Sequence, residues 1–586
     1  MPTRFSGATR RSSTGFRERS NLKELDEVDV IAKQRDMIAS ALQAAVDRCA
    51  AEGLLQVGPV HEIHLEAPRS KEHGHLATNL ALVLGSEAGL PPRKVAELLV
   101  DKLDLEEAAV RRVEIAGPGF INFHLSQDWW GKLLAVVLAK GPRYGRRTAK
   151  NPQKIQLEFV SANPTGPMNV VNARAAAVGD CLARLLAAVG EDVSKEFYVN
   201  DSGNQADQFA RSLEARFRQL LGEDAKIPPD GYPGEYVLDV AKELFDEHPE
   251  LVKMSPEERL EFFQQQGLDR MVEWQRRDLE AFGVTFDVWF RERDLHQAGQ
   301  VEAVVRELQK RGHIYEEDGA LWFRSTAYGD DKDRVLVRSD GQPTYLAADI
   351  AYHRNKYGRG FDRVIDIWGP DHHGYIARMK AAVQALGRKE DDLEVIILQL
   401  VNLLRGGQQV RMSKRTGTFV GMAELVEEVG RDAARFFFLM RSPESHLDFD
   451  LDLAQEQSAD NPVYYVQYAH ARICSILRQA EERGIALPGP EGIDADLLAT
   501  DHEEELLKCL VAFPREVEAA ALRREPHRIA HYVQELASLF HSFYTHCRVI
   551  GEEEELQAAR LTLVMGVQTV LSNALELLGV SAPEVM

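Results

Sequence analysis

One short segment carries several side chains that could handle a polyphosphate. The segment is RMSKRTGTFV, residues 411–420, in which Arg411, Lys414 and Arg415 surround Ser413. Closely spaced cations neutralise phosphate charge, and a serine hydroxyl can donate a hydrogen bond to a phosphate oxygen. An exposed basic loop without a ligand has the same composition, and the string taken alone favours that second interpretation.

A second segment has the geometry of an anion site. Residues 155–160, IQLEFV, are expected to form a strand that enters the turn NPTGP and then an alanine-rich helix over about 172–189. A helix that follows such a turn directs its first backbone amides at whatever lies in the turn. Ligands of open α/β sheets also bind at the carboxyl ends of strands. The pattern alone is weak, because many strand–turn–helix units bind nothing.

The elements that would position these segments alternate between strand and helix. Further strands are expected at EFYVND (196–201), RVIDIWG (363–369) and VIILQL (395–400). Strands that alternate with helices predict a parallel, Rossmann-type sheet. A long, charged and mostly helical insertion is expected at about 204–317. The sequence therefore predicts an α/β Rossmann-type catalytic domain over 155–459.

Different patterns flank this domain. Residues 30–126 combine helical stretches with strand-like segments and a Gly-Pro-Gly turn, which predicts an α+β N-terminal domain. Residues 127–154 are expected to form a basic linker, and residues 1–29 a disordered basic tail. Apolar side chains recur at three- and four-residue spacing from residue 460 onward, which predicts an all-α helical bundle over 460–586.

The overall charge restricts how this chain could bind nucleic acid. Its composition is that of an ordinary globular protein, with 44% hydrophobic and 28% charged residues. The net charge of -22 is unusual for a nucleic-acid-binding protein, so contacts with phosphate have to come from local basic patches. Residues 140–154 hold six basic residues and no acidic one. They fit an RNA-binding patch and a solvated interdomain linker equally well.

The spacing of the cysteines and the composition of the first twenty residues bear on the cellular compartment of the protein. The five cysteines are scattered and none forms a CxxC pair, which argues against a disulfide framework or structural zinc and favours a reducing, cytoplasmic compartment. No run of roughly 18 or more apolar residues suggests a membrane span. The first twenty residues hold five arginines and one acid. They resemble a transit peptide in composition, but we favour a disordered extension.

Together the two chemical segments resemble the paired signatures of class I aminoacyl-tRNA synthetases, an HxGH turn after the first strand and a KMSKS loop after the last. RMSKR resembles that loop, with Arg411 at its first lysine. The resemblance narrows to the arginyl-tRNA synthetases and covers about residues 30–586. It is carried by LEFVSANPTGP, EFYVNDSGNQ, TYLAADIAYH, WGPDHHGYIARMKAA and RSPESHLDFDLDLAQEQSADNPVYYVQYAHARI.

The resemblance implies an activity. Arginine would attack the α-phosphate of ATP to form an arginyl-adenylate with release of pyrophosphate, and the 3′-terminal adenosine of tRNA would then accept the arginyl group. Such chemistry depends on positioning and charge stabilisation more than on a protein nucleophile. The implied partners are L-arginine, tRNA(Arg) and ATP with Mg²⁺ as its counter-ion. No protein-bound metal and no membrane are expected, and the enzyme would be monomeric and cytoplasmic.

The resemblance also implies roles for individual residues. Lys414 would stabilise the charge that develops on pyrophosphate. The catalytic positions would be Lys414, Ser413, Asn169 and Asn172. The ATP-binding positions would be Ala162, Asn163, Pro164, Thr165, Gly166, Pro167, Met168, Val170, Val171, Gly369, Asp371, His372, Arg411, Met412 and Arg415. The arginine-binding positions would be Glu158, Asn163, Tyr345 and Asp349.

Physical chemistry supports part of this assignment. Carboxylates hold a guanidinium through paired hydrogen bonds, and Tyr345 and Asp349 stand four apart on an expected helix, so they share one face. For any one of these acids alone, a surface or capping role is the default. The alternative for His372 and His373 is a polar pair in a turn. A metal site is a further option, but no third ligand is evident at suitable spacing.

One stretch departs from the family pattern. Where the family usually carries His-x-Gly-His, this chain has Asn169-Val170-Val171-Asn172. An asparagine amide can still donate a hydrogen bond to phosphate or ribose, but it carries no positive charge. Val171 places a β-branched side chain where bare backbone would let adenine approach. We expect phosphate handling to persist while the adenine contacts are rearranged.

The resemblance implies that residues 30–126 contact the tRNA elbow and that residues 460–586 bind the anticodon. Two alternatives to an active ligase remain, a silent relative that keeps tRNA binding and a different adenylyl-transferring enzyme. The helical domain argues against the second alternative, and Lys414 with the NPTGP turn argues against the first. The candidate RNA contacts, which fit core and rim equally well, are Tyr464, Tyr465, Gln467, Tyr468, His470 and Arg472.

Overall fold

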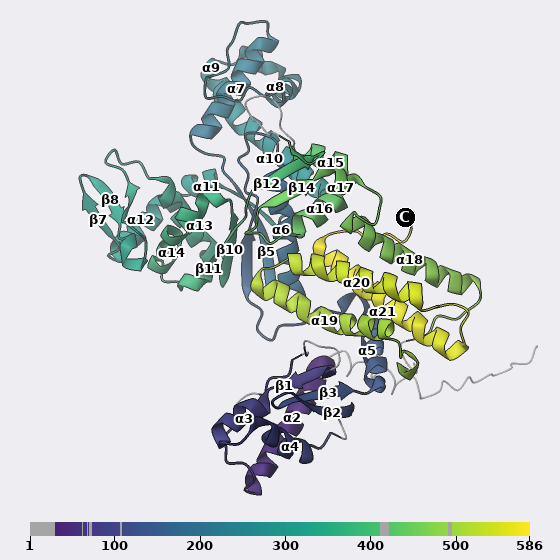
Figure 1. The fold of residues 1–586 in the computed structure, drawn as a ribbon. Helices are drawn as coiled ribbons and strands as arrows, with labels where there is room; N and C mark the ends of the chain where they lie inside the picture. Colours follow the sequence, from purple (N-terminus) through teal and green to yellow (C-terminus); the bar gives the residue numbers. More distant parts are fainter. Residues whose placement is uncertain are drawn as a thin grey trace, which may run out of the picture.

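The structure is a computed structural model that describes residues 30–60, 63–66, 68, 73–105, 108–410, 421–489 and 495–586. The expectations for the basic tail (1–29) and for the RMSKRTGTFV loop (411–420) therefore lie outside the described residues. Figure 1 shows a central sheet with a helical protrusion above it, a second lobe to the left, a helical bundle to the right and the N-terminal domain below.

The N-terminal domain is a small α+β unit, as the sequence predicts. Its antiparallel sheet has the order β1-β3-β2. The turn between β2 and β3 contains Gly117 and Gly119 at φ +52° and +144°, a conformation that glycine adopts without a steric penalty. The elements are α2 (Val30–Ala51), β1 (Leu76–Thr78), α3 (Leu80–Ala88), α4 (Pro92–Asp101), β2 (Val110–Ala116) and β3 (Phe120–Leu125).

Five parallel strands form the central sheet in the order β11-β10-β4-β5-β6, which confirms the predicted Rossmann-type domain. The order of the strands reverses between β4 and β10. The carboxyl ends of these two strands therefore border the crevice in which open α/β sheets bind ligands. The elements are β4 (Lys154–Glu158), α6 (Val170–Ala188), β5 (Asp192–Val199), β6 (Val288–Arg291), β10 (Arg363–Trp368) and β11 (Leu393–Ile397).

A helical protrusion leaves the sheet after β5 and returns to it at β6 (Figure 1). It has an apolar core of its own, which includes Phe209, Phe217 and Met271. The protrusion is shorter than the insertion expected at 204–317, because the chain returns to the sheet at β6. This strand was not predicted, since four residues carry little periodic signal. Its elements are α7 (Asn204–Leu220), α8 (Glu235–Glu247), η3 (Pro249–Lys253), α9 (Pro256–Phe262), the π-helical turn η4 (Phe263–Gly267) and α10 (Leu268–Ala281).

A second lobe packs beside β10 and β11. It combines helices with a three-stranded antiparallel sheet in the order β7-β8-β9. Helix α13 of this lobe carries two of the expected arginine-binding residues. The elements are α11 (Glu292–Gln297), α12 (Gln300–Lys310), β7 (Ile314–Glu317), β8 (Ala320–Phe323), η5 (Ser325–Tyr328), β9 (Arg334–Val337), α13 (Tyr345–Gly358), η6 (Pro370–Tyr375), α14 (Ile376–Ala385) and η7 (Glu390–Asp392).

A third small sheet follows β11 and leads to the bundle. Its order is β13-β12-β14, and β12 pairs in parallel with β14. The peptide between β13 and the next helix includes residues 411–420, so the two flanks of that segment belong to this unit. The elements are β12 (Val401–Arg405), β13 (Gln408–Gln409), α15 (Met422–Val429), α16 (Arg431–Leu439), β14 (Leu447–Asp450) and α17 (Leu451–Gln455).

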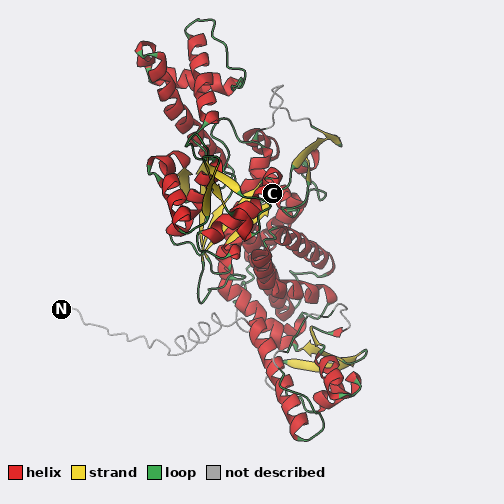
Figure 2. Cartoon of the chain, turned by 90° about the vertical axis from the view of Figure 1, so that its left-hand side faces the viewer, coloured by secondary structure: helices red, strands yellow, loops and turns green. Residues whose placement is uncertain are grey.

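The C-terminal domain is a bundle of long helices, as predicted (Figure 2). The segment expected as a basic linker is attached to it. Helix α5 packs against α21, Asn573 Nδ2 donates to the carbonyls of Gly141 (2.8 Å) and Tyr144 (3.0 Å), and Arg147 pairs with Glu518. The elements are α5 (Gln127–Lys140), η2 (Gly141–Arg143), α18 (Pro462–Glu482), η8 (Ala495–Leu497), α19 (Asp501–Arg523), α20 (His527–His546) and α21 (Glu554–Leu578).

Helix α21 is long and apolar enough to cross a membrane by length and composition alone, and it is the one such helix among the described residues. In the structure 72% of its apolar window is buried inside the protein. It packs against α18, α19, α20 and α5. Its hydrophobicity is accounted for by this central place in the bundle.

Candidate functional site

The strand that enters the candidate site ends in a strained bend. Val160 and Ser161 have φ angles of +68° and +38°, in a region that is unfavourable for a β-branched residue such as valine. Strain of this kind is found at functional sites, where the surrounding structure fixes it. Here Ser161 Oγ donates to Glu158 Oε1 (2.9 Å) and accepts from the Tyr198 amide (3.1 Å). The bend therefore fixes the end of β4 against β5.

The turn after this bend is held by the helical protrusion. Gln275 Nε2 donates to the carbonyls of Asn163 (3.0 Å) and Gly166 (3.1 Å). The Tyr236 hydroxyl donates to the carbonyl of Thr165 (2.7 Å). The carbonyls of the NPTGP turn are thus bound to α8 and α10, which orients the turn that the sequence marks as an ATP-binding segment.

The start of α6 is a capping box. Asn169 Oδ1 accepts from the Asn172 amide, and Asn172 Oδ1 accepts from the Asn169 amide, both at 3.0 Å. Asparagine is among the best residues for this position, because its side chain satisfies a helix amide that has no other partner. Both side-chain oxygens are therefore used within the helix start, and the two Nδ2 groups are left as donors. The Asn-x-x-Asn spacing was a sequence signal for this cap.

The segment that follows residues 411–420 is anchored at the same place. Gly421 forms an antiparallel bridge with Asn169, and the Met422 amide donates to the Met168 carbonyl (2.9 Å). On the other flank, the Val410 amide donates to the Leu403 carbonyl (2.8 Å). The chain thus leaves the RMSKRTGTFV segment directly beside the first turn of α6. Gly421 and Met422, which follow one of the two segments that carry the sequence resemblance, therefore contact the other segment.

A buried arginine fixes α6 near its start. The Arg174 guanidinium donates to the main-chain carbonyls of Gln399 (2.7 Å), Ser442 (2.9 Å) and Ser445 (2.9 Å). No ion pair with a carboxylate is found for it among the described residues, and burial lowers the pKa of Arg174 to about 10. These bonds join the helix to the peptides that lead into β12 and β14.

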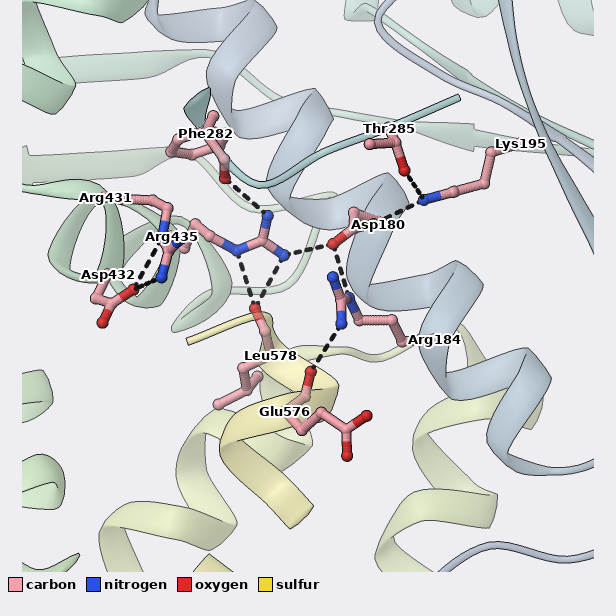
Figure 3. Close-up of polar contacts among 10 residues, drawn as sticks. All are labelled: Asp180, Arg184, Lys195, Phe282, Thr285, Arg431, Asp432, Arg435, Glu576 and Leu578. Atoms are coloured by element: carbon pink, nitrogen blue, oxygen red, sulfur yellow. Dashed lines mark hydrogen bonds and ion pairs between the residues drawn. The ribbon is translucent and has the colours of Figure 1, made fainter. Parts of the chain in front are cut away.

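A second charged cluster fixes the same helix farther along (Figure 3). Asp180 pairs with Arg435 (2.7 Å), Arg184 (2.8 Å) and Lys195 (3.1 Å). Burial opposes ionisation, but the three cations hold the pKa of Asp180 below its ordinary value. Arg435 also donates to the carbonyl of Leu578 at the end of α21 (3.1 Å). The helix that begins at the candidate site is therefore joined directly to the C-terminal bundle.

Close packing lets the helix approach the sheet. A side chain at Gly179 would place its Cβ 2.2 Å from the Phe159 ring, which is closer than any real contact. Phe159 lies directly after β4 and is fully buried. Only glycine fits between this ring and α6, so the position supports the geometry of the site without touching a ligand.

Acidic side chains gather at the crevice between β4 and the second lobe. Glu158 ends β4, Glu292 begins α11 and Asp349 lies in the first turns of α13. Burial, together with the charges of Glu292 and Glu158, raises the pKa of Asp349 to about 6, against the hydrogen bond from Tyr375 and the charge of His353, which lower it. The three acids therefore concentrate negative charge at this crevice.

Tyr198 lines the same crevice. Its ring lies 4.5 Å from the Tyr352 ring and 6.1 Å from the Phe290 ring, measured between centroids. Burial raises the pKa of Tyr198, and the neighbouring carboxylates of Glu292 and Asp349 raise it further. Its phenol is therefore a neutral hydrogen-bonding group among acids.

The structure places the expected arginine-binding residues unequally. Glu158 and Asp349 are close enough to interact electrostatically. Tyr345 is on the same helix as Asp349 but is 70% exposed. Asn163 is exposed, and its Nδ2 donates to Gln205 Oε1 (2.8 Å).

The expected nucleotide-side residues lie just after β10, at the turn η6, whose Tyr375 hydroxyl donates to Asp349 Oδ2 (2.5 Å). Gly369 is the N-cap of this turn, and Asp371 and His372 lie on it, where they are exposed and pair at 3.4 Å. The His372 ring lies 6.1 Å from that of Trp368. Within the part of the chain that the structure describes, no group of three or more histidine, cysteine or acidic side chains could hold a metal ion.

Sequence reasoning missed Glu292, Tyr198 and Lys356. Glu292 and Tyr198 lie at or just after the carboxyl ends of β6 and β5, so a rule based on strand ends could have found them. Lys356 lies on α13 and is fully buried. No motif marks it, because its role depends on two strands that are distant in the sequence.

The candidate RNA contacts of the bundle separate into two groups. His470 is buried, with its ring nitrogens 2.8 Å from the Pro583 carbonyl and 2.9 Å from Ser572 Oγ. Tyr464 and Tyr468 are stacked at 6.1 Å, and the Arg472 guanidinium lies 4.7 Å from the centre of the Tyr468 ring. His470 is therefore part of the packing of the bundle, whereas Tyr464, Tyr468 and Arg472 are partly accessible to solvent.

Three family models match the chain in succession. They are "Arginyl tRNA synthetase N terminal domain" over residues 33–125, "tRNA synthetases class I (R), catalytic domain" over 133–442, and "DALR anticodon binding domain" over 466–586. Together they account for the N-terminal domain, the sheet with its lobes, and the bundle.

Relatives of similar length support the same grouping. The chain is 50% identical to an arginine–tRNA ligase of Caldanaerobacter subterraneus subsp. tengcongensis over 95% of its own length and 100% of the relative's. It is 52% identical to one of Desulforudis audaxviator over the same shares. Among solved structures, Thermus thermophilus arginyl-tRNA synthetase aligns with a TM-score of 0.70 at 25% identity, covering 94% of this chain and 100% of that one.

Proposed function

This chain belongs to the arginyl-tRNA synthetases, a class I family, and from that premise we propose how its residues carry out the family's reaction. The enzyme activates arginine with ATP and joins it to tRNA(Arg). The observation that carries the placement of the site is the crevice at the strand reversal, bordered by Glu158 at the end of β4 and by η6 after the end of β10. Asp349 of α13 reaches the same crevice, where the Tyr375 hydroxyl of η6 donates to its Oδ2 (2.5 Å).

Arginine is proposed to bind among the three carboxylates. Its guanidinium would form paired hydrogen bonds with acids that are unfavourable neighbours in its absence, so binding relieves their repulsion. Asp349 and Glu292 surround the phenol of Tyr198 and are the proposed guanidinium partners. Glu158, at the strand end next to the turn, would hold the other end of the amino acid together with Asn163. Tyr345 would cover the mouth of the pocket.

ATP is proposed to bind on the opposite side of the turn. Its phosphates would face the first turn of α6, where the helix dipole and the free Nδ2 groups of Asn169 and Asn172 supply donors. Gly369 with the exposed Asp371 and His372 would contact the nucleoside. The anchoring of Gly421 beside Asn169 supports a phosphate role for the preceding basic segment.

Because both signature histidines are replaced by asparagine, more of the charge stabilisation has to come from the basic segment at residues 411–420. Neutral amides can orient a phosphate, but they cannot neutralise the charge that develops as pyrophosphate leaves. We assign that charge stabilisation to Lys414, with Arg411 and Arg415 as neighbouring cations and Ser413 and Met412 shaping the segment. Mg²⁺ is proposed to accompany ATP as its counter-ion, and the enzyme is proposed to act as a monomer in the cytoplasm.

One experiment tests the proposal as a whole. ATP–pyrophosphate exchange should be measured with each standard amino acid, with and without tRNA(Arg). We expect exchange with arginine only, raised strongly by the tRNA. Exchange with another amino acid but not with arginine would overturn the specificity. Absence with every amino acid, while tRNA still binds, would favour a silent relative.

A further inference from the structure

A lysine is buried directly beneath the proposed arginine pocket. Lys356 has no exposed surface, and its Nζ lies 2.6 Å from Glu158 Oε2 and 2.8 Å from Asp366 Oδ1. The ammonium also lies 4.4 Å from the centre of the Tyr352 ring. Lys356 comes from the last turns of α13, the helix that also carries Asp349.

The strand register explains why a cation is needed there. Glu158 on β4 and Asp366 on β10 are direct partners across the parallel pair. Like charges placed opposite each other on neighbouring strands destabilise a sheet, and both side chains are buried. Lys356 bridges the two carboxylates, and its positive charge offsets the repulsion between them.

The remaining oxygens of both acids are fixed as well. Ser161 Oγ donates to Glu158 Oε1 (2.9 Å), and His353 Nε2 lies 3.0 Å from Asp366 Oδ2. Each oxygen of Glu158 therefore has a partner, one from the strained bend and one from α13. A stable core alone would not require these charges, because apolar residues of similar volume often replace a buried ionic cluster without loss of stability.

We propose that Lys356 is a positioning residue for arginine binding, which holds the Glu158 carboxylate charged and in a single orientation at the floor of the pocket. The inference rests on the proposed role of Glu158 as a ligand of arginine. Lys356 itself does not contact the substrate. Its effect on the reaction passes through Glu158.

The charge of Glu158 is decided by several elements. Burial raises its pKa and Asp366 and Glu196 raise it further, whereas Lys356 lowers it through its charge and hydrogen bond. The pKa of Glu158 lies above its ordinary value even with Lys356 present, and loss of Lys356 would raise it further, so that the carboxylate would form only at a higher pH than in the wild type. The ionisable groups facing it are Lys356, Tyr352 and Asp349 on α13, Asp366 on β10, and Glu196 and Tyr198 on β5. Glu292 on α11 faces Asp349 and Tyr198 in turn.

The test is Lys356→Met, which keeps the length of the side chain and removes its charge. The KM for arginine and kcat should be measured in aminoacylation from about pH 6.5 to about pH 9 and divided by the wild-type values, which cancels the ionisation of free arginine. We expect the KM ratio to be about tenfold or more at neutral pH and to fall as pH rises, with kcat and the KM for ATP nearly unchanged.

A purely structural lysine gives a different result. It would lower kcat or the amount of active enzyme without a pH-dependent KM for arginine. Lys380→Met is the matched control, because Lys380 pairs with Glu390 at the surface of α14 (3.3 Å) and should leave both constants unchanged. A flat KM ratio in Lys356→Met would overturn the inference.

Two more variants keep the outcome decisive. If Lys356→Met does not fold, the charge-compensated pair Lys356→Met/Asp366→Asn removes one acid with the base. Its KM for arginine should depend on pH in the same direction, with the change shifted to lower pH because Asp366 no longer raises the pKa of Glu158. Glu158→Gln tests the premise, since it should raise the KM for arginine at every pH. An unchanged KM in Glu158→Gln would refute the role of Glu158. A raised KM there with a flat ratio for Lys356→Met would refute only the role of Lys356.

Discussion

The cap at the start of α6 allows its structural and chemical roles to be separated. Asn169 uses its oxygen to cap the helix, while its Nδ2 is proposed to face the phosphates of ATP. Asn169→Asp keeps the capping oxygen, removes the donor and adds a negative charge. Asn169→Ala removes cap and donor together and adds no charge. The two variants should therefore rank in opposite orders in a stability assay and in an activity assay.

The stability side follows from the capping box. Loss of an N-cap side chain costs about 1 kcal/mol, so Asn169→Ala should be destabilised by that amount. Asn169→Asp should stay within about 0.5 kcal/mol of wild type, since aspartate caps equally well and favours the helix dipole. Urea denaturation followed by fluorescence compares the three proteins, and an Asn169→Ala protein as stable as wild type would show that the cap contributes nothing.

The activity side follows from charge. An added carboxylate about 5 Å from a phosphate charge, at an effective dielectric constant of about 20, is repelled by about 3 kcal/mol. That corresponds to a loss of roughly 100-fold in kcat/KM for ATP. Asn169→Ala loses one neutral hydrogen bond, about 1 kcal/mol, or roughly fivefold. ATP–pyrophosphate exchange measures both, and an Asn169→Asp enzyme as active as Asn169→Ala would mean that no phosphate lies at this helix start.

Three further predictions concern other parts of the enzyme. Lys414→Ala should lower arginine activation by orders of magnitude while tRNA affinity, measured by filter binding, stays near normal; unchanged turnover would remove Lys414 from the mechanism. The pKa of Asp349, raised by burial to about 6, means that its carboxylate is lost as pH falls through that value. The KM for arginine should therefore rise below about pH 6, a dependence that Asp349→Asn should lack, and equal pH profiles would contradict this. Arg435→Met should destabilise the protein by about 3 kcal/mol or more, because it leaves the buried carbonyls of Leu578 and Phe282 without this donor and removes one of the three cations that pair with the buried Asp180. The exposed Arg431→Met should cost less than about 1 kcal/mol, and equal melting temperatures for the two would refute the role of the buried cluster.

The sequence predicts the class of the fold because its elements carry local signals. The strand–turn–helix at residues 155–189 and the helical periodicity after residue 460 are both found where they are expected. The four-residue strand β6 was not predicted, because it is too short for a periodic pattern and is defined by its pairing with β5, a strand that is distant in the sequence. Element periodicity thus predicts domains well and short strands poorly.

The site is predictable where residues lie in a motif and not where they meet only in space. Asn169 and Asn172 were recognised as a departure in sequence, but their capping role depends on backbone positions that the structure provides. Glu292 and Lys356 belong to no motif. They reach the pocket because β6 and α13 bring them to Glu158 from positions more than a hundred residues away in the chain.

The unusual start of α6 is compatible with an active enzyme because the helix is held by other means. A histidine signature would have to orient the helix start and to supply charge. In this chain the asparagine pair provides the cap, while Arg174 and the Asp180 cluster fix the helix to the β12–β14 sheet and to the bundle. The orientation of α6 therefore does not depend on histidines at positions 169 and 172. What the asparagines cannot supply is charge, and the cations that adjoin this helix start in the proposal are those of residues 411–420. Restoring a histidine at Asn172 should accordingly do little in the wild type and should partly rescue Lys414→Ala, whereas no rescue would show that the two segments do not share this task.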